Sequence, residues 1–184
     1  MKDRQHTSLI TRMACNAGLF MVLCNSGIAQ SEDNLNFKGT LVAEPCVIAL
    51  EDADTTIDFG NVVDRYLYIN GQSPKVNFTL KVSECDTDQA SLATITFTGA
   101  ESAALPGYLS TDPGSMASGI AIGIEKANGG LLMLNQPQAS FRLTKGQNTF
   151  GFLAFVKGES AAIAGKTIEK GNFSATATFA FTYE

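Results

Sequence analysis

The sequence is almost without histidine: among its 184 residues the only one is His6. His6 lies in a stretch that we expect to be removed during export, so the mature chain is predicted to contain no histidine. That absence excludes serine or cysteine nucleophiles activated by histidine. It also excludes metal sites in which histidine binds copper, zinc or iron. Two of the commonest routes to catalysis are therefore closed to this chain.

A glycosidase would need only a pair of carboxylates, and the chain has many acidic residues. These residues fall mostly in turn-like stretches such as Glu51–Asp54 and Asp86–Asp88. Solvated side chains are the expected outcome there, rather than a paired acid and base. We therefore predict that the chain is not an enzyme, with no cofactor and no metal ion. A secreted enzyme on a β-sandwich is the weaker alternative.

Long hydrophobic runs are also missing, apart from one near the N-terminus at residues 14–24, which is too short to span a bilayer. It follows a basic start made by Lys2, Arg4 and Arg12. The small-x-small pattern Gly27-Ile28-Ala29 comes after it, so residues 1–29 are predicted to be a secretory signal peptide cut after Ala29. An uncleaved interfacial helix is the alternative. Lipid attachment at Cys24 is disfavoured because Leu23 stands where a small residue is expected.

Positive charge is scarce, with 13 basic against 18 acidic residues. Three of the basic residues but only one acidic residue lie in the predicted signal peptide, so the mature chain is more acidic still. This balance argues against nucleic acid, whose binding requires lysine and arginine to neutralise phosphates. The remaining chain of roughly 155 residues has the size of one domain and is predicted to be soluble and exported, without membrane insertion.

Only two cysteines, Cys46 and Cys85, remain after the signal peptide. In an oxidising compartment an even pair indicates a disulfide, which would close a loop and contribute about 4 kcal/mol in the chain-entropy model. Two free thiols or a metal pair are the alternatives. A zinc site is disfavoured because it needs about four ligands and histidine is unavailable.

What the sequence has in abundance is short alternating segments. The clearest is Val76–Val82, followed by Leu92–Thr98, Ile120–Ile124, Leu131–Leu134, Phe150–Val156 and Asn172–Glu184. Residues 61–75, 101–118 and 158–171 are expected to be irregular or loops. No helical periodicity is sustained over three turns. The pattern predicts an all-β sandwich.

The stretch Asp33–Val42 is a further strand candidate. Leu35, Phe37, Gly39 and Leu41 share one parity, and polar residues occupy the other. Spacing alone favours pairing within the chain's own sheet. The alternative is a strand donated to a neighbouring molecule, and the residues by themselves leave the two open.

Several motifs in order resemble the pilin subunits of chaperone-usher fimbriae, of the type 1 and P pilus kind. They are Asn36-Phe37-Lys38-Gly39 followed by Cys46; Val82-Ser83-Glu84-Cys85; Phe97-Thr98-Gly99; Gly171, fourteenth from the C-terminus; and Ala175–Phe179 leading to Tyr183. The run Glu101–Gly107 also looks like a P pilus minor tip subunit, which favours a minor or adapter subunit. The resemblance covers essentially the whole mature chain.

The resemblance implies an incomplete immunoglobulin-like β-sandwich of six strands, with an open groove that a partner's donor strand completes. Residues 30–42 would be the donor-strand extension, with Leu35, Phe37, Gly39 and Leu41 facing a neighbour's groove, and residues 43–184 the pilin domain. The residues expected to form the groove strand and to meet the chaperone are Gly171, Phe173, Phe179, Phe181, Tyr183 and Glu184.

The same resemblance implies a structural or adapter subunit of a surface fimbria that contributes to cell adhesion. Its partners would be neighbouring fimbrial subunits, a periplasmic chaperone and an outer-membrane usher, and it would pass through the periplasm to the cell surface. The alternative function is a tip adhesin domain that binds a host glycan, with Tyr108 in the long loop as a possible contact. Against it, such adhesins normally carry a separate lectin domain, for which this chain has no room.

Overall fold

The computed structural model describes residues 38, 41, 43–48 and 54–184. The chain divides into two units, Met1–Leu41 and Val42–Glu184, and the fold described below is that of the second unit. The predicted signal peptide, and Leu35, Phe37 and Gly39 of the predicted donor strand, lie outside the described residues.

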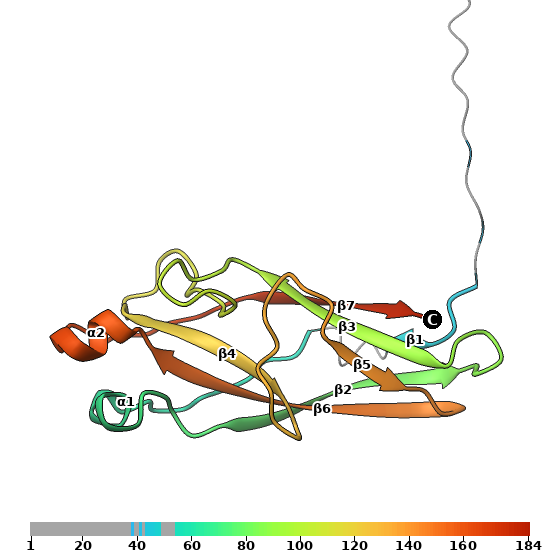
Figure 1. Ribbon diagram of the computed structural model, residues 1–184, viewed down its shortest axis with the longest axis horizontal. Helices are drawn as coiled ribbons and strands as arrows, with labels where there is room; N and C mark the ends of the chain where they lie inside the picture. Colours follow the sequence, from blue (N-terminus) through green and yellow to red (C-terminus); the bar gives the residue numbers. More distant parts are fainter. Residues whose placement is uncertain (1–37, 39–40, 42, 49–53) are drawn as a thin grey trace, which may run out of the picture. The chain divides into compact units, whose positions relative to one another are not determined.

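Two antiparallel sheets form the domain (Figure 1). The first has the order β1-β2-β6-β4 and is built from β1 (Val47–Ile48), β2 (Val76–Cys85), β6 (Gly146–Gly158) and β4 (Ile120–Lys126). The second has the order β5-β3-β7 and is built from β5 (Ala139–Arg142), β3 (Leu92–Gly99) and β7 (Ala177–Tyr183). The predicted all-β sandwich is confirmed, and the described part of the chain holds seven strand segments.

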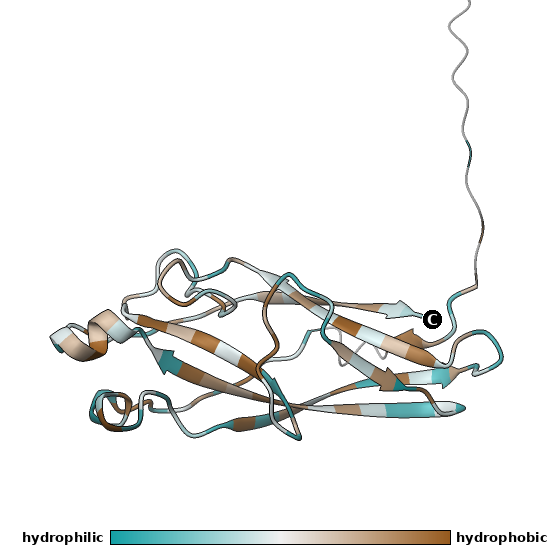
Figure 2. Ribbon diagram, in the orientation of Figure 1, coloured by the Kyte–Doolittle hydropathy of each residue, from teal (hydrophilic) through white to brown (hydrophobic). Residues whose placement is uncertain are grey.

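The core lies between the sheets because alternate residues of each strand point inward, as the alternation of apolar and polar residues along the strands shows (Figure 2). Leu80 and Val82 of β2 and Phe152 and Val156 of β6 point into this core, and all four side chains are at most 2% exposed. On β6, Phe155 points away from the core but is also buried, because it covers Gly123 of β4. This confirms β6 as a central strand with two apolar faces.

The predicted disulfide between Cys46 and Cys85 is present. It joins the chain just before β1 to the last residue of β2, and Cys46 is fully buried. The first residues of the domain are therefore fixed to the first sheet directly after the predicted donor strand.

Two short helices were not predicted. α1 (Asp64–Asn70) falls in a region expected to be irregular, and α2 (Ser160–Gly165) falls in an expected loop. Each is about two turns long, which is too short for a periodic pattern to show. Gly71 ends α1 in the left-handed conformation, and its backbone N–H donates to the carbonyl of Leu67.

Two predicted strands are corrected by the structure. Residues 131–134 make a single bridge, Leu131 with Glu125, and then turn. The C-terminal strand begins at Ala177 rather than at Asn172, because its partner β3 ends at Gly99, opposite Ala177. Upstream of that point the chain bonds to a loop: Met116 N–H donates to Asn172 O at 2.8 Å.

Candidate functional site

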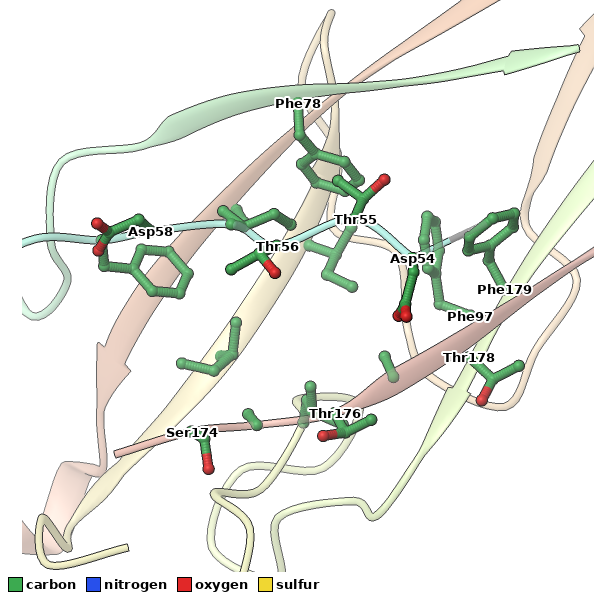
Figure 3. A pocket seen from close by; sticks show the side chains of 18 of the residues that line it. Asp54, Thr55, Thr56, Asp58, Phe78, Phe97, Ser174, Thr176, Thr178 and Phe179 are labelled. Atoms are coloured by element: carbon green, nitrogen blue, oxygen red, sulfur yellow. The ribbon is translucent and has the colours of Figure 1, made fainter. Parts of the chain in front are cut away.

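An open groove of about 920 Å³ runs beside the C-terminal part of the chain (Figure 3). One wall is formed by residues 173–179, which include the start of β7, and the other by residues 54–59, which belong to neither sheet. Within residues 43–48 and 54–184, β7 pairs with β3 alone, so it is the edge strand of its sheet there. The groove therefore lies where a further strand would complete the sandwich.

The wall on the β7 side alternates in the way that a groove requires. Phe173, Ala175, Ala177 and Phe179 are half-buried and pack against the core, while Ser174 and Thr178 point away from the groove (Figure 3). The two alanines are small, so they leave space in the middle of the wall. Side chains from outside the domain can occupy that space.

The floor of the groove is apolar and rigidly packed. Phe97 and Phe152 meet edge to face with ring centroids 5.2 Å apart, and Phe78 stacks on Phe152 at 5.3 Å. The other floor residues are Leu80, Leu109, Ile122, Ile124 and Ala154, all at most 7% exposed. A groove with this lining fits an apolar strand and offers little to a charged small molecule.

The opposite wall was missed as a functional element. Ile57 and Phe59 are half-buried and share one parity, so alternation over residues 54–59 is the signal that points to an extended segment facing the core. Phe59 meets Phe173 of the other wall with ring centroids 6.3 Å apart, which marks one end of the groove. The sequence did not indicate that this segment would stand apart from both sheets.

A loop holds the first part of the β7-side wall in place. The two carboxylate oxygens of Asp112 accept hydrogen bonds from the backbone N–H and the hydroxyl of Thr176, at 3.0 and 2.9 Å. Asp112 N–H in turn donates to Ser174 O at 2.8 Å, and Ser174 N–H donates to the hydroxyl of Ser115. This loop takes the place of β3 beside residues 172–176.

Gly171 is placed where this loop approaches the wall. A Cβ on Gly171 would overlap Met116 Cβ and lie 3.1 Å from the carbonyl carbon of Met116. We expect Gly171→Ala to displace the start of the wall and cost about 1–3 kcal/mol, because the Cβ and backbone of Met116 would have to move. The measurement is urea unfolding of the native protein and the variant, each with a strand peptide bound in the groove. Gly165→Ala is the control, since its nearest neighbour is 3.5 Å away; equal stability of the two variants would contradict the prediction.

The far end of β7 is fixed to β3 rather than frayed. The main-chain oxygen of Glu184 accepts hydrogen bonds from the N–H groups of Ser91 and Leu92, at 2.8 and 2.9 Å. Phe181 packs on Phe150 with ring centroids 5.8 Å apart, and its ring stacks on that of Tyr183. Burial raises the pKa of Tyr183, with a smaller contribution from the charge of Glu44. The predicted groove-strand residues thus lie along one continuous edge.

One ion pair ties α1 to the chain just before the wall. Lys170 Nζ lies 3.0 Å from a carboxylate oxygen of Asp64. This hydrogen bond, together with one from the N–H of Arg65, lowers the pKa of Asp64 below its ordinary value and raises that of Lys170. The pair is solvent-exposed, so it contributes little to stability.

The loop that carries Tyr108 is more ordered than expected. Leu109 pairs with Ile122 of β4, and Tyr108 packs edge to face on Phe155 with ring centroids 6.2 Å apart. Burial raises the pKa of Tyr108, and the charge of Glu125 adds to the effect. Tyr108 is thereby committed to packing, with only part of its ring exposed.

Among the described residues, no cluster of histidine, cysteine, aspartate or glutamate is arranged to hold a metal ion. No helix in that part of the chain has the length and apolar character needed to cross a membrane.

Comparison with known proteins agrees with this geometry. The profile of the family described as "Fimbrial protein" matches residues 35–184. Fimbria A protein of Serratia marcescens is 33% identical over 84% of this chain and 86% of its own length. The Escherichia coli fimbrial adapter PapK is 30% identical over 90% of this chain and 95% of its own. The crystal structure of the P pilus rod subunit PapA superposes with a TM-score of 0.66 at 28% identity, covering 77% of this chain and all of PapA.

The chain therefore belongs to the Fimbrial protein family. It is a structural subunit of a cell-surface pilus of the chaperone-usher type and not an enzyme, as the motifs in its sequence predicted. Leu41 is the member of the predicted donor positions that the structure describes, and its side chain is fully exposed.

Proposed function

We propose that the groove receives a donor strand from a neighbouring fimbrial subunit, and that residues 30–42 of this chain are the strand it donates to the next. The observation that carries the proposal is the open groove of about 920 Å³ beside the edge strand β7. A strand added at this edge completes the sheet by backbone hydrogen bonds, and side chains that enter the groove give specificity.

The arm and the groove match in length and parity. Leu35, Phe37, Gly39 and Leu41 span seven residues in alternation, and so do the inward-facing wall residues Phe173, Ala175, Ala177 and Phe179. Gly39 would suit a point where the groove has no room for a side chain; a simple strand bulge is its other possible role.

The energetics support a linkage without covalent chemistry. Burying Leu35, Phe37 and Leu41 contributes roughly 1.5–3 kcal/mol each. Each backbone hydrogen bond along the added strand contributes about 1 kcal/mol net. Separation of two subunits requires all of these contacts to be lost together, so dissociation is slow.

A periplasmic chaperone is a second partner in this proposal. An apolar groove next to an unpaired strand edge promotes aggregation until it is filled. A chaperone strand would cover the groove during transit through the periplasm. The C-terminal carboxylate of Glu184 would be a further contact for basic chaperone residues. At the outer-membrane usher the arm of the next subunit would replace the chaperone.

The position of the subunit in the fibre is a separate part of the proposal. The resemblance of residues 101–107 to a minor tip subunit favours a minor or adapter place, and a contribution to adhesion through the assembled fibre. Immunogold labelling of intact fibres tests this: sparse labelling near the tip supports it, and continuous labelling along the shaft rejects it.

The donor-strand proposal is tested by peptide exchange on the complex of the mature chain with its chaperone. A synthetic peptide of residues 33–42 is expected to displace the chaperone. The matched control carries serine in place of Leu35, Phe37 and Leu41 and is expected to leave the complex intact, because it has nothing to bury. If the native peptide does not displace the chaperone, or both peptides displace it equally, the proposal fails.

A further inference from the structure

An apolar stripe is exposed on α1, at the end of the domain opposite to β1 and the C-terminus (Figure 1). Val63 immediately precedes the helix, and Tyr66 and Ile69 follow within it at every third position, so Tyr66 and Ile69 are neighbours on one side of the helix. Their exposed fractions are 58%, 45% and 71%. Leu67, which is 2% exposed, already fixes the helix to the core. The stripe is therefore surplus to the packing of the domain.

A small hollow lies next to this stripe. It encloses about 200 Å³ and is lined by Phe59, Val62, Val63, Tyr66, Pro74 and Val76, among others. Phe59 also lines the large groove, at the end where it meets Phe173. The hollow and that end of the groove thus share Phe59, so a chain that leaves the groove there would pass close to the stripe.

The direction of the donor strand determines which of its two ends lies at this end of the groove. All five strand pairings of the two sheets are antiparallel. β7 runs from the α1 end of the domain toward the C-terminus (Figure 1). A donor strand antiparallel to β7 therefore runs toward the α1 end, and its C-terminal residues leave the groove beside Phe59 and Phe173.

The tether between a donor strand and its own domain is short. In this chain four residues separate Leu41, the last groove-facing position, from the buried and disulfide-bonded Cys46. Five extended residue steps cover at most about 17 Å. The domain that donates the strand must therefore sit directly against the α1 end of the domain that receives it.

We propose that Val63, Tyr66, Ile69 and the adjoining hollow form a docking surface for the arm-bearing end of the following fimbrial subunit. This inference rests on the proposed donor-strand function and adds a second contact to each junction. Because one end of a subunit meets the opposite end of the next, the contact is heterologous.

The arm-bearing end of this chain shows the chemistry expected of that partner. Val47 is 50% exposed and lies next to the half-exposed Pro45, which gives an apolar patch to meet the stripe. Both ends of the domain carry exposed charged residues of both signs, such as Arg65 and Glu169 near α1, so the complementarity that supports the contact is apolar.

Thiol labelling of assembled fibres tests the docking surface. The mature chain's two cysteines are joined in a disulfide, so Ile69→Cys introduces one free thiol. In fibres sheared from cells we expect maleimide to label it about tenfold more slowly than in the urea-unfolded chain, because the following subunit covers it. The matched control is Asn128→Cys, on the exposed turn after β4, which is expected to react within about twofold of the unfolded rate.

The outcomes separate this inference from the one on which it rests. If Ile69→Cys enters fibres and is labelled as fast as Asn128→Cys, the α1 stripe is free at the junction and the docking surface is rejected, while donor-strand exchange stands. If the variant that lacks residues 30–37 but is otherwise unchanged still enters fibres, the donor-strand proposal itself is rejected. Slow labelling of Ile69→Cys alone supports the docking surface.

Discussion

Deletion of residues 30–37, with the signal peptide and its cleavage site intact, is expected to stop the protein from joining the subunit ahead of it in the fibre. The deletion removes Leu35 and Phe37. Burial of these two side chains in the neighbour's groove would contribute about 3–6 kcal/mol of binding free energy. A loss of that size lowers the equilibrium for insertion by at least about a hundredfold. The truncated chain should still reach the periplasm and copurify with its chaperone, since its own groove is unchanged.

Quantitative immunoblots of purified fibres and of periplasmic chaperone complexes measure both halves of this prediction. The matched control replaces Asn34 and Asn36 by serine, which changes the polar face of the arm and leaves the apolar face intact. The control is expected to enter fibres normally. Truncated protein present in fibres at the normal level would reject the donor role of the arm.

Phe181→Asp is expected to prevent capture by the chaperone and to lead to proteolysis in the periplasm. Phe181 packs against Phe150 and Phe179, so the substitution removes aromatic contacts and places a carboxylate against the core. Phe181 is half-buried, so its loss costs part of the about 3–5 kcal/mol typical of a fully buried phenylalanine, and the unpaired charge adds to that cost. A loss of that size is a large fraction of the net stability of a domain.

The control for Phe181→Asp is Thr182→Asp. It introduces the same charge one residue further along β7, on the exposed face of the strand. The periplasmic yield of chaperone complex should be near normal for Thr182→Asp and strongly reduced for Phe181→Asp. Equal yields of the two variants would show that the inward face of β7 does not matter for capture.

Much of the fold followed from local patterns in the sequence. Strands β2 and β3 were predicted because inward residues such as Leu80 and Ile95 alternate with polar ones, and β4 because isoleucines such as Ile122 recur at every second position. The disulfide followed from an even pair of cysteines in an exported chain. The strands depend on residues that are neighbours in the sequence. The disulfide needs only that the two cysteines of the mature chain are each other's sole available partner.

What could not be predicted depends on contacts between distant segments. β7 starts late because β3 ends opposite Ala177, and no local feature of Asn172–Thr176 reports where β3 ends. The hydrogen bonds between Asp112 and Thr176 join residues 64 positions apart, and Asp112 lies in a stretch that the sequence predicts only as a loop. The residues of the groove strand were expected from a family resemblance, whereas the opposite wall at 54–59 required the structure.

The central claim is that the domain folds around a groove that only another polypeptide fills. Hydrogen exchange of the backbone amides of the mature chain, alone and with a peptide of residues 33–42, tests it most directly. We predict that amides of β7 and of residues 54–59 exchange fast in the solitary chain, and that the peptide slows them by orders of magnitude. A solitary chain that is monomeric, unfolds cooperatively and protects these amides equally well without peptide would contradict the account.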